Sequence, residues 1–200
     1  MMIERKAESH KQSQRERILE AAKRCFVQSG FHSASMATIS ETAGMSPGLI
    51  YRYFENKKAI ILAIVEAELE TVQRRLCDMP NTDDLASSLV DYFDSYDEER
   101  YDSVSAPLFL EISAEAARDP EIAEAVSRID DIVRDAIADW FHRSREEGGY
   151  GLPVEAARDR ALALIFLVDG MKVRKAREPG IDRRRLRNAI DLIVAALPGL

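Results

Sequence analysis

The sequence has little of what marks several large classes of protein. Its two cysteines, Cys25 and Cys77, lie far apart and form no CxxC motif, so a disulfide scaffold is excluded and reduced thiols are expected. Nine glycines and seven prolines are few for an all-β fold with its many tight turns. The longest apolar run, 161–168, is far shorter than the roughly 20 residues that span a bilayer. The polar residues 1–10 lack the apolar stretch of a secretory signal, so a cytoplasmic protein is expected.

Charge is unevenly distributed along the 200 residues. The formal net charge is −7, yet residues 1–60 carry ten basic against six acidic residues, a balance of +4. Residues 61–200 carry eighteen basic against twenty-nine acidic residues, a balance of −11. A basic first third on an acidic remainder predicts a polyanionic partner for the first third alone. The alternative is a chance distribution, which charge by itself leaves open.

Apolar residues recur at three-to-four spacing almost throughout, which is the period of an amphipathic helix. Cap and stop signals, such as Ser35, Gly44, Ser46-Pro47 and Asp119-Pro120, divide the pattern into separate helices. We therefore expect an all-α fold of about nine helices in two domains, residues 1–57 and residues 58–200. The expected helices span about 13–29, 36–43, 47–54, 56–76, 85–93, 108–117, 120–141, 154–176 and 183–197.

Two short helices around Ala43-Gly44-Met45-Ser46 have the length and the glycine-containing turn of a helix-turn-helix. A major groove admits one α-helix, and the short turn lets the second helix enter it. In that second helix, Pro47 and Gly48 permit close approach to DNA, and the segment Tyr51–Tyr53 supplies hydroxyl and guanidinium donors. The alternative is a helical hairpin whose aromatic residues pack in a core.

The segment RERILEAAKRCFVQSGFHSASMATISETAGMSPGLIYRYFENKKAIILAIVE, residues 15–66, resembles the N-terminal domain of TetR-family transcriptional regulators. The matching motifs cover about a quarter of the chain. They are ILEAA with Phe26, Gly30-Phe31, Ser35–Ile39, Ala43–Ser46, Gly48–Phe54 and Asn56-Lys57. Residues 108–126 and 161–197 resemble the C-terminal region of the BetI-like subgroup.

The resemblance implies a helix-turn-helix DNA-binding domain over residues 1–57, called the head below, and a helical ligand-binding and dimerisation domain over residues 58–200. It further implies a homodimeric repressor on double-stranded, palindromic operator DNA, released by a small-molecule inducer that changes the spacing of the two heads. Whether the protein represses or activates stays open. Carried over by position, the DNA-facing residues are Ala37, Thr38, Ser46, Pro47, Gly48, Leu49, Tyr51, Arg52, Tyr53 and Lys57. Of these, Thr38, Tyr51, Tyr53 and Lys57 are expected on phosphates, and Gly48, Leu49 and Arg52 near base edges. Leu49 either touches a thymine methyl group or packs.

The C-terminal domain is expected to hold an apolar or amphipathic effector between about Leu85 and Met171, with the helix 56–76 as the lever that links it to the head. Ordinary core packing is the alternative for each pocket candidate: Phe93, Tyr96, Phe109, Ile112, Trp140, Phe141, Phe166 and Met171. Because residues 161–168 are apolar on every face, the last two helices are expected to dimerise as a four-helix bundle. The interface candidates are Leu164, Val168, Ile190, Ile193 and Leu197.

An enzyme is the rival class, and the sequence offers it little. There is no Glu-x-x-His, HExxH, P-loop, GxGxxG or GxSxG motif, and the three histidines form no motif with either cysteine. We therefore expect no catalytic activity, no cofactor and no metal. Four polar residues near apolar stripes, Glu111, Asp139, His142 and Asp169, are expected at the surface or in pairs. The basic residues Arg5, Lys6 and Lys11, with Arg15 and Arg17, either add phosphate contacts or form a solvated tail.

Overall fold

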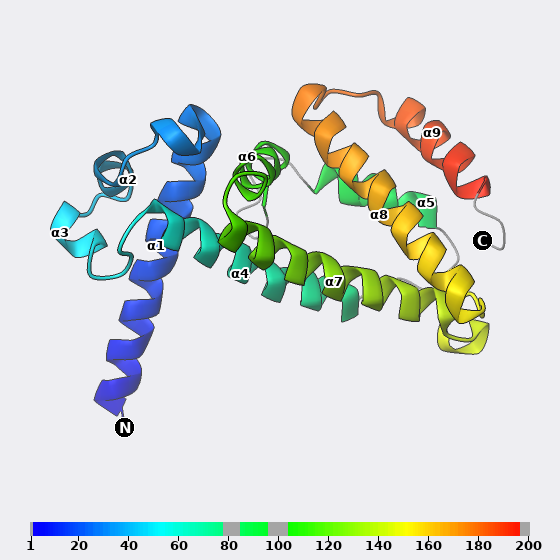
Figure 1. Ribbon diagram of the computed structural model, residues 1–200, viewed down its shortest axis with the longest axis horizontal. Helices are drawn as coiled ribbons and strands as arrows, with labels where there is room; N and C mark the ends of the chain where they lie inside the picture. Colours follow the sequence, from blue (N-terminus) through cyan, green and yellow to red (C-terminus); the bar gives the residue numbers. More distant parts are fainter. Residues whose placement is uncertain (1, 78–84, 96–103, 197–200) are drawn as a thin grey trace. The chain divides into compact units, whose positions relative to one another are not determined.

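The computed structural model describes residues 2–77, 85–95 and 104–196, and within these ranges it contains nine α-helices and no strand (Figure 1). The predicted all-α fold is thereby confirmed. The helices are α1 (Met2–Ser33), α2 (Met36–Thr42), α3 (Pro47–Ile50), α4 (Lys57–Cys77), α5 (Leu85–Asp94), α6 (Ala106–Ala116), α7 (Pro120–His142), α8 (Val154–Arg177) and α9 (Arg183–Ala195). A 3-10 turn, η2 (Arg145–Glu147), lies between α7 and α8. Of the helices searched, none is long and apolar enough to cross a bilayer.

Two boundaries differ from expectation. The first helix begins at Met2 and not near residue 13, although the apolar stripe starts only at Ile18. The expected helix 47–54 is regular only to Ile50, and hydrogen-bonded turns continue it, with the Phe54 amide donating to the Ile50 carbonyl at 3.0 Å. Short helices are stabilised by packing more than by propensity, so their ends are hard to read from sequence.

The chain forms two compact units. The N-terminal unit comprises Met1–Glu68 with Leu110–Ala125, and the C-terminal unit comprises Leu69–Phe109 with Val126–Leu200. Three helices, α4, α6 and α7, therefore pass from one unit into the other. The expected domain boundary between residues 57 and 58 stays a prediction, because these units group residues by contact and not by independent folding.

The N-terminal unit is built on the apolar face of α1. Ile18, Ala22 and Phe26 lie one helical turn apart and are fully buried. They are joined in the core by Ile39 of α2 and Ile50 of α3. The turn between α2 and α3 needs Gly44, whose φ of +61° is readily adopted only by glycine. The burial of one face of each short helix leaves the other face available for a partner.

The C-terminal unit has its own core, formed by apolar residues of α5, α7, α8 and α9. Three aromatic rings pack together at one end of it: Trp140 lies 4.9 Å from Phe141 and 5.1 Å from Tyr150 between ring centroids. The apolar segment 161–168 is covered only in part within this chain. Its residues Ala161 and Leu164 are buried, whereas Leu162 and Phe166, one helical turn apart, are exposed.

Candidate nucleic-acid interface

The α2–α3 segment is held as a rigid turn by its own polar groups. The Ser35 hydroxyl caps α2 by accepting from the Thr38 amide at 3.0 Å. The Ser40 hydroxyl donates to the carbonyl of Met45 at 2.9 Å, and the Met45 amide donates back to the Ser40 carbonyl at 2.9 Å. These bonds close the turn from α2 into α3. Ser46 and Pro47 then start α3, with proline at a position where no amide proton is needed.

All of the predicted DNA-facing residues are accessible to solvent, and the exposed fraction of their side chains varies. Tyr51 is 56% exposed, although it is a large aromatic residue. Leu49, Tyr53 and Lys57 are half-buried. The remaining members of the set are exposed: Ala37, Thr38, Ser46, Pro47, Gly48 and Arg52. Their individual roles on DNA stay predictions.

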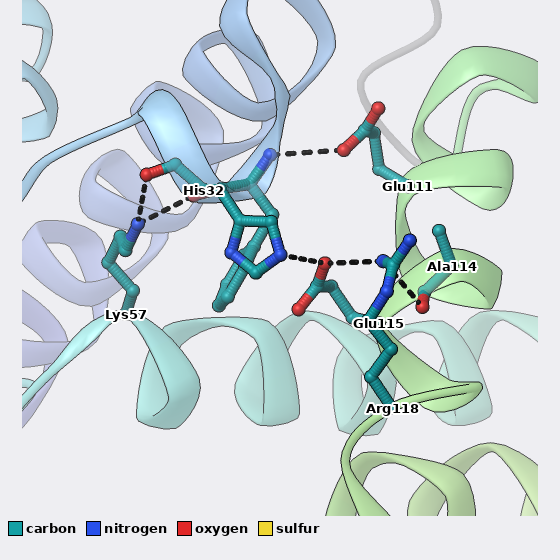
Figure 2. A network of polar contacts seen from close by, with 7 residues as sticks. His32, Lys57, Glu111, Ala114, Glu115 and Arg118 are labelled. Carbon is teal, nitrogen blue, oxygen red and sulfur yellow. Dashed lines mark hydrogen bonds and ion pairs between the residues drawn. The ribbon is translucent and has the colours of Figure 1, made fainter.

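Lys57 is engaged within the protein. Its Nζ donates to the carbonyl of Phe31 at 2.6 Å and to that of His32 at 3.0 Å, and it lies 4.8 Å from the centroid of the Phe31 ring (Figure 2). An ammonium group has three N–H donors, so two of them are occupied by these carbonyls. Lys57 therefore links the end of α1 to the start of α4. This role does not depend on a contact with DNA.

The end of α1 is bent at Gly30. Its φ of +76° and ψ of 157° lie in a region that only glycine adopts readily, and they interrupt the helix before Phe31. The bend leaves the Phe31 amide without a helical acceptor, and this amide donates to Oε2 of Glu111 on α6 at 3.0 Å (Figure 2). A β-carbon at Gly30 would lie 3.6 Å from the same carboxylate oxygen. The turn at residues 30–32 therefore contacts α6 closely.

A second carboxylate of α6 lies one helical turn further on. Glu115 is only 5% exposed, and its Oε1 lies 3.4 Å from Nε2 of His32 and 3.4 Å from a guanidinium nitrogen of Arg118. Arg118 also donates to the carbonyl of Ala114 at 3.0 Å. A buried carboxylate needs such partners to offset its lost hydration. We call two contacts together the α6 clamp: the hydrogen bond from the Phe31 amide to Glu111, and the contact between His32 and Glu115 (Figure 2).

Lys58 extends the anchorage to the junction of α6 and α7. Its Nζ lies 2.6 Å from Glu121 and 2.9 Å from Asp119. Hydrogen bonds to Glu121 and then to Asp119 raise the pKa of the Lys58 ammonium above its ordinary value. The hydrogen bond from Lys58 lowers the pKa of Asp119, helped by amides of Glu121 and Ile122 at the start of α7. Both groups are therefore held in their charged forms.

The sequence did not identify this anchorage. Glu111 was expected at the surface or in a pair, and it does pair, with a backbone amide 80 positions earlier. The sequence pattern does not indicate that Glu115 contacts His32, or that Asp119 and Glu121 contact Lys58. Contacts between residues more than sixty positions apart produce no recognisable spacing in a single sequence. The bend at Gly30 was foreseen only as a helix stop.

The pocket candidates do not form one group. Phe93, Trp140, Phe141 and Met171 are buried in the core of the C-terminal unit, and Phe109 lies beneath the ammonium of Lys172. Ile112 is buried but belongs to the N-terminal unit. Phe166 is 67% exposed in the single chain, and its contact with an effector stays a prediction. Tyr96 lies outside the described residues.

The dimer candidates also separate. Leu164 and Ile190 lie in the core of their own chain, and with Leu164 only 4% exposed they have almost no surface left for a partner. Val168 is half-buried and Ile193 is exposed, while Leu197 lies outside the described residues. The exposed apolar residues that sequence reasoning missed are Leu162 on α8 and Leu192, 75% exposed, on α9. The pattern could not find them because a helix apolar on all sides does not reveal which face is covered.

The described residues contain no cluster of three or more histidine, cysteine, aspartate or glutamate side chains that could hold a metal. The indole Nε1 of Trp140 is buried and has no hydrogen-bond partner among the described residues.

Comparison with known proteins gives consistent results for both parts of the chain. Residues 18–64 match the family of bacterial regulatory proteins named after tetR, and residues 82–199 match the C-terminal region of BetI-type transcriptional repressors. The HTH-type transcriptional regulator UidR of Escherichia coli (strain K12) is 29% identical over 153 residues, which cover 76% of this chain and 77% of UidR. GusR of Salmonella enterica has a similar structure, with a TM-score of 0.69 and 28% identity over 90% of this chain and 95% of that one. A transcriptional regulator from Saccharomonospora viridis, solved in complex with choline, shares the fold with a TM-score of 0.72 and 20% identity over 90% and 95% of the two chains.

Proposed function

Because this chain belongs to the TetR family of bacterial transcriptional regulators, we propose that it is a dimeric repressor released from a palindromic operator by a small-molecule inducer. The observation that carries the proposal is the helix-turn-helix itself. Its α2 and α3 bury Ile39 and Ile50 and leave Tyr51 and Arg52 on the accessible side, as a helix that enters a major groove requires.

The proposed division of labour on DNA follows from side-chain chemistry. Phosphate contacts position the protein, and Thr38, Tyr51, Tyr53 and Lys57 can donate to phosphate oxygens. Base contacts specify the sequence, and Arg52 is exposed and can pair with guanine through two hydrogen bonds. Gly48 offers no side chain, so it lets the backbone of α3 approach the groove. Half-sites about 34–36 Å apart would suit a dimer of such heads.

The exposed apolar residues of the last two helices support dimerisation. Leu162 and Phe166 on α8, with Leu192 and Ile193 on α9, are large apolar side chains exposed in a single chain. Large apolar side chains gathered on the exposed sides of two helices are typical of an interaction site. Two helices from each subunit across a two-fold axis would cover them as a four-helix bundle.

The effector proposal rests on the C-terminal unit, which has a large apolar and aromatic core, and on the choline-bound regulator that shares the fold. An inducer can shift DNA affinity only by its differential affinity for the two states of the protein. A 100-fold release of operator DNA corresponds to about 2.7 kcal/mol of coupling between the two sites. The chemical identity of the inducer is a matter for screening.

The test is a titration of the full chain against duplex DNA from upstream of its own gene, followed by fluorescence anisotropy at near-physiological salt. A scrambled duplex is the competitor, and Arg52→Ala is the matched variant. The proposal expects the native duplex to bind about a thousandfold or more tighter than the scrambled one. It expects Arg52→Ala to lose most of that preference while retaining weak binding to both. Equal, micromolar binding of both duplexes by the wild type, repeated with DNA selected from the whole genome, would overturn it.

A further inference from the structure

A dimer on a two-fold operator, the proposed function on which this inference rests, requires each DNA-binding head to be held in a defined orientation. Residues 110–125, which include the second half of α6 and the start of α7, belong to the same compact unit as the helix-turn-helix. The head is thus attached to the rest of the chain by α6 and α7 as well as by α4, which follows it directly in sequence. Contacts within this unit set the orientation of the helix-turn-helix relative to α6.

The turn at residues 30–32 is the point of attachment. Three backbone polar groups at its centre are engaged: the Phe31 amide by Glu111, and the carbonyls of Phe31 and His32 by Lys57. Figure 2 shows Glu111 and Lys57 reaching this turn from opposite sides. Hydrogen bonds to charged groups are shorter and about twice as strong as neutral ones, so the turn is held firmly between α6 and α4.

The turn leads directly into the DNA-binding helices. Ser35, three residues after His32, caps α2, and α2 contacts α3 through the turn closed by Ser40 and Met45. A shift of residues 30–32 relative to α6 is therefore transmitted to α3 with little slack. Of the two carboxylates of the α6 clamp, only Glu111 binds the backbone of this turn, whereas Glu115 contacts the exposed His32 side chain.

We propose that Glu111 is a positioning residue for operator binding. By accepting a hydrogen bond from the Phe31 amide, it sets the orientation of the recognition helix relative to α6 and so restricts the half-site spacing that the dimer accepts. The carboxylate makes no contact with DNA in this role. It acts through the turn, and its loss loosens the head without removing any residue of the DNA-facing set.

The experiment uses the full chain and a series of operator duplexes in which one base pair is inserted or deleted at the centre of symmetry. Each step moves the half-sites by about 3.4 Å and rotates them by about 36°. For the wild type we expect affinity to fall about tenfold or more with each single-base-pair change, within the range of losing one or two base contacts. For Glu111→Ala we expect the fall to shrink to about threefold or less.

Matched variants separate positioning from general damage. Glu111→Gln keeps an oxygen that accepts from the Phe31 amide, so it should retain the spacing dependence of the wild type. Glu111→Asp keeps the charge but shortens the reach, so it should behave like Glu111→Ala. Glu66→Ala, an exposed carboxylate on α4, is the control for loss of negative charge. Thermal unfolding of each variant is recorded, because a merely destabilised protein would lose affinity equally for all spacings.

The outcomes are distinguishable. A wild type that prefers one spacing, together with Glu111→Ala and Glu111→Asp that prefer it equally, overturns the inference and leaves the proposed function intact. A wild type without specific binding, or without any preferred spacing, overturns the proposed function and the inference with it. A flattened spacing profile in Glu111→Ala and Glu111→Asp, with that of the wild type retained in Glu111→Gln and Glu66→Ala, supports the inference.

Discussion

Lys57 and Lys58 are neighbours at the start of α4, yet their ammonium groups have opposite kinds of partner. Lys57 donates to two neutral carbonyl oxygens, whereas Lys58 is paired with the carboxylates of Glu121 and Asp119. The ammonium of Lys57 is therefore paired with neutral acceptors, whereas the positive charge of Lys58 is balanced by two carboxylates. This difference makes the two residues a matched pair for testing contacts with DNA.

The first prediction concerns the salt dependence of operator binding. Each phosphate contact contributes about −0.9 to the slope of log K against log salt concentration. Lys57→Ala should make the slope shallower by about 0.9 per subunit and weaken binding, and Lys58→Ala should leave the slope unchanged. Anisotropy titrations over a range of salt concentrations measure this. An unchanged slope in Lys57→Ala would restrict that residue to holding the turn at residues 30–32.

The second prediction concerns acid and alkaline stability. The folded-state pKa of Asp119 is lowered, so its contribution to the free energy of unfolding is present above about pH 4 and is lost as the pH falls through the folded value. The folded-state pKa of Lys58 is raised, so its contribution is present below about pH 10.5 and is lost as the pH rises through the folded value. The stability difference between the wild type and Lys58→Ala should be largest between these limits and shrink at both ends.

Urea unfolding across the pH range measures that difference. Asp119→Asn retains an oxygen for the amides of Glu121 and Ile122 but loses the charge. Its difference from the wild type should shrink toward acid pH, where Asp119 is protonated, and in part toward alkaline pH, where Lys58 loses its charge. All of these groups lie at the surface, so the effect should also diminish in high salt. A difference that is constant across pH would contradict the ion-pair explanation.

The third prediction concerns the association state. Phe166→Glu places a charge on an exposed apolar face and should produce monomers, as seen by sedimentation velocity or light scattering. Leu164→Ala removes a buried side chain from the core of one chain, so it should lower the free energy of unfolding by about 2–5 kcal/mol. It should leave the particle mass unchanged. A monomeric Leu164→Ala with a dimeric Phe166→Glu would place the interface elsewhere.

The fourth prediction concerns the only tryptophan of the chain. Trp140 is 2% exposed and its indole N–H is unsatisfied among the described residues, which costs free energy. Trp140→Phe removes that N–H while keeping a ring against Phe141 and Tyr150, so it should change the free energy of unfolding by less than about 1.5 kcal/mol. Trp140→Ala should cost about 3–5 kcal/mol. Chemical denaturation followed by circular dichroism distinguishes the two, and equal losses would contradict this account.

Some features of this molecule could be predicted from the sequence, and others could not. The all-α class and most helix boundaries followed from apolar spacing and from local cap signals such as Ser35, because both depend on residues within a few positions of each other. The α2–α3 turn was predicted for the same reason. The contact of Phe31 with Glu111 joins residues 80 positions apart, and that of Lys58 with Asp119 joins residues 61 positions apart. No local pattern in the sequence encodes such contacts.

The C-terminal helices illustrate a second limit. The segment 161–168 was correctly identified as unusually apolar, but its residues could not be divided between the core and a partner surface. That division depends on which side α5 and α7 cover, and it placed Leu164 inside and Phe166 outside. A helix with a polar face would have made the distinction readable from its sequence.

The α6 clamp has a consequence for exchanging DNA specificity between regulators. In a chimera that replaces only residues 1–57, the turn at residues 30–32 and residue 57 come from the donor, whereas Glu111 and Glu115 on α6 stay native. The contacts of Phe31 with Glu111 and of His32 with Glu115 would then join residues from two different proteins. The module that can be exchanged is discontinuous in sequence. It consists of Met1–Glu68 together with Leu110–Ala125, which form one compact unit although more than forty residues separate them along the chain. Grafts that carry both pieces should inherit the donor's spacing rule along with its base preference.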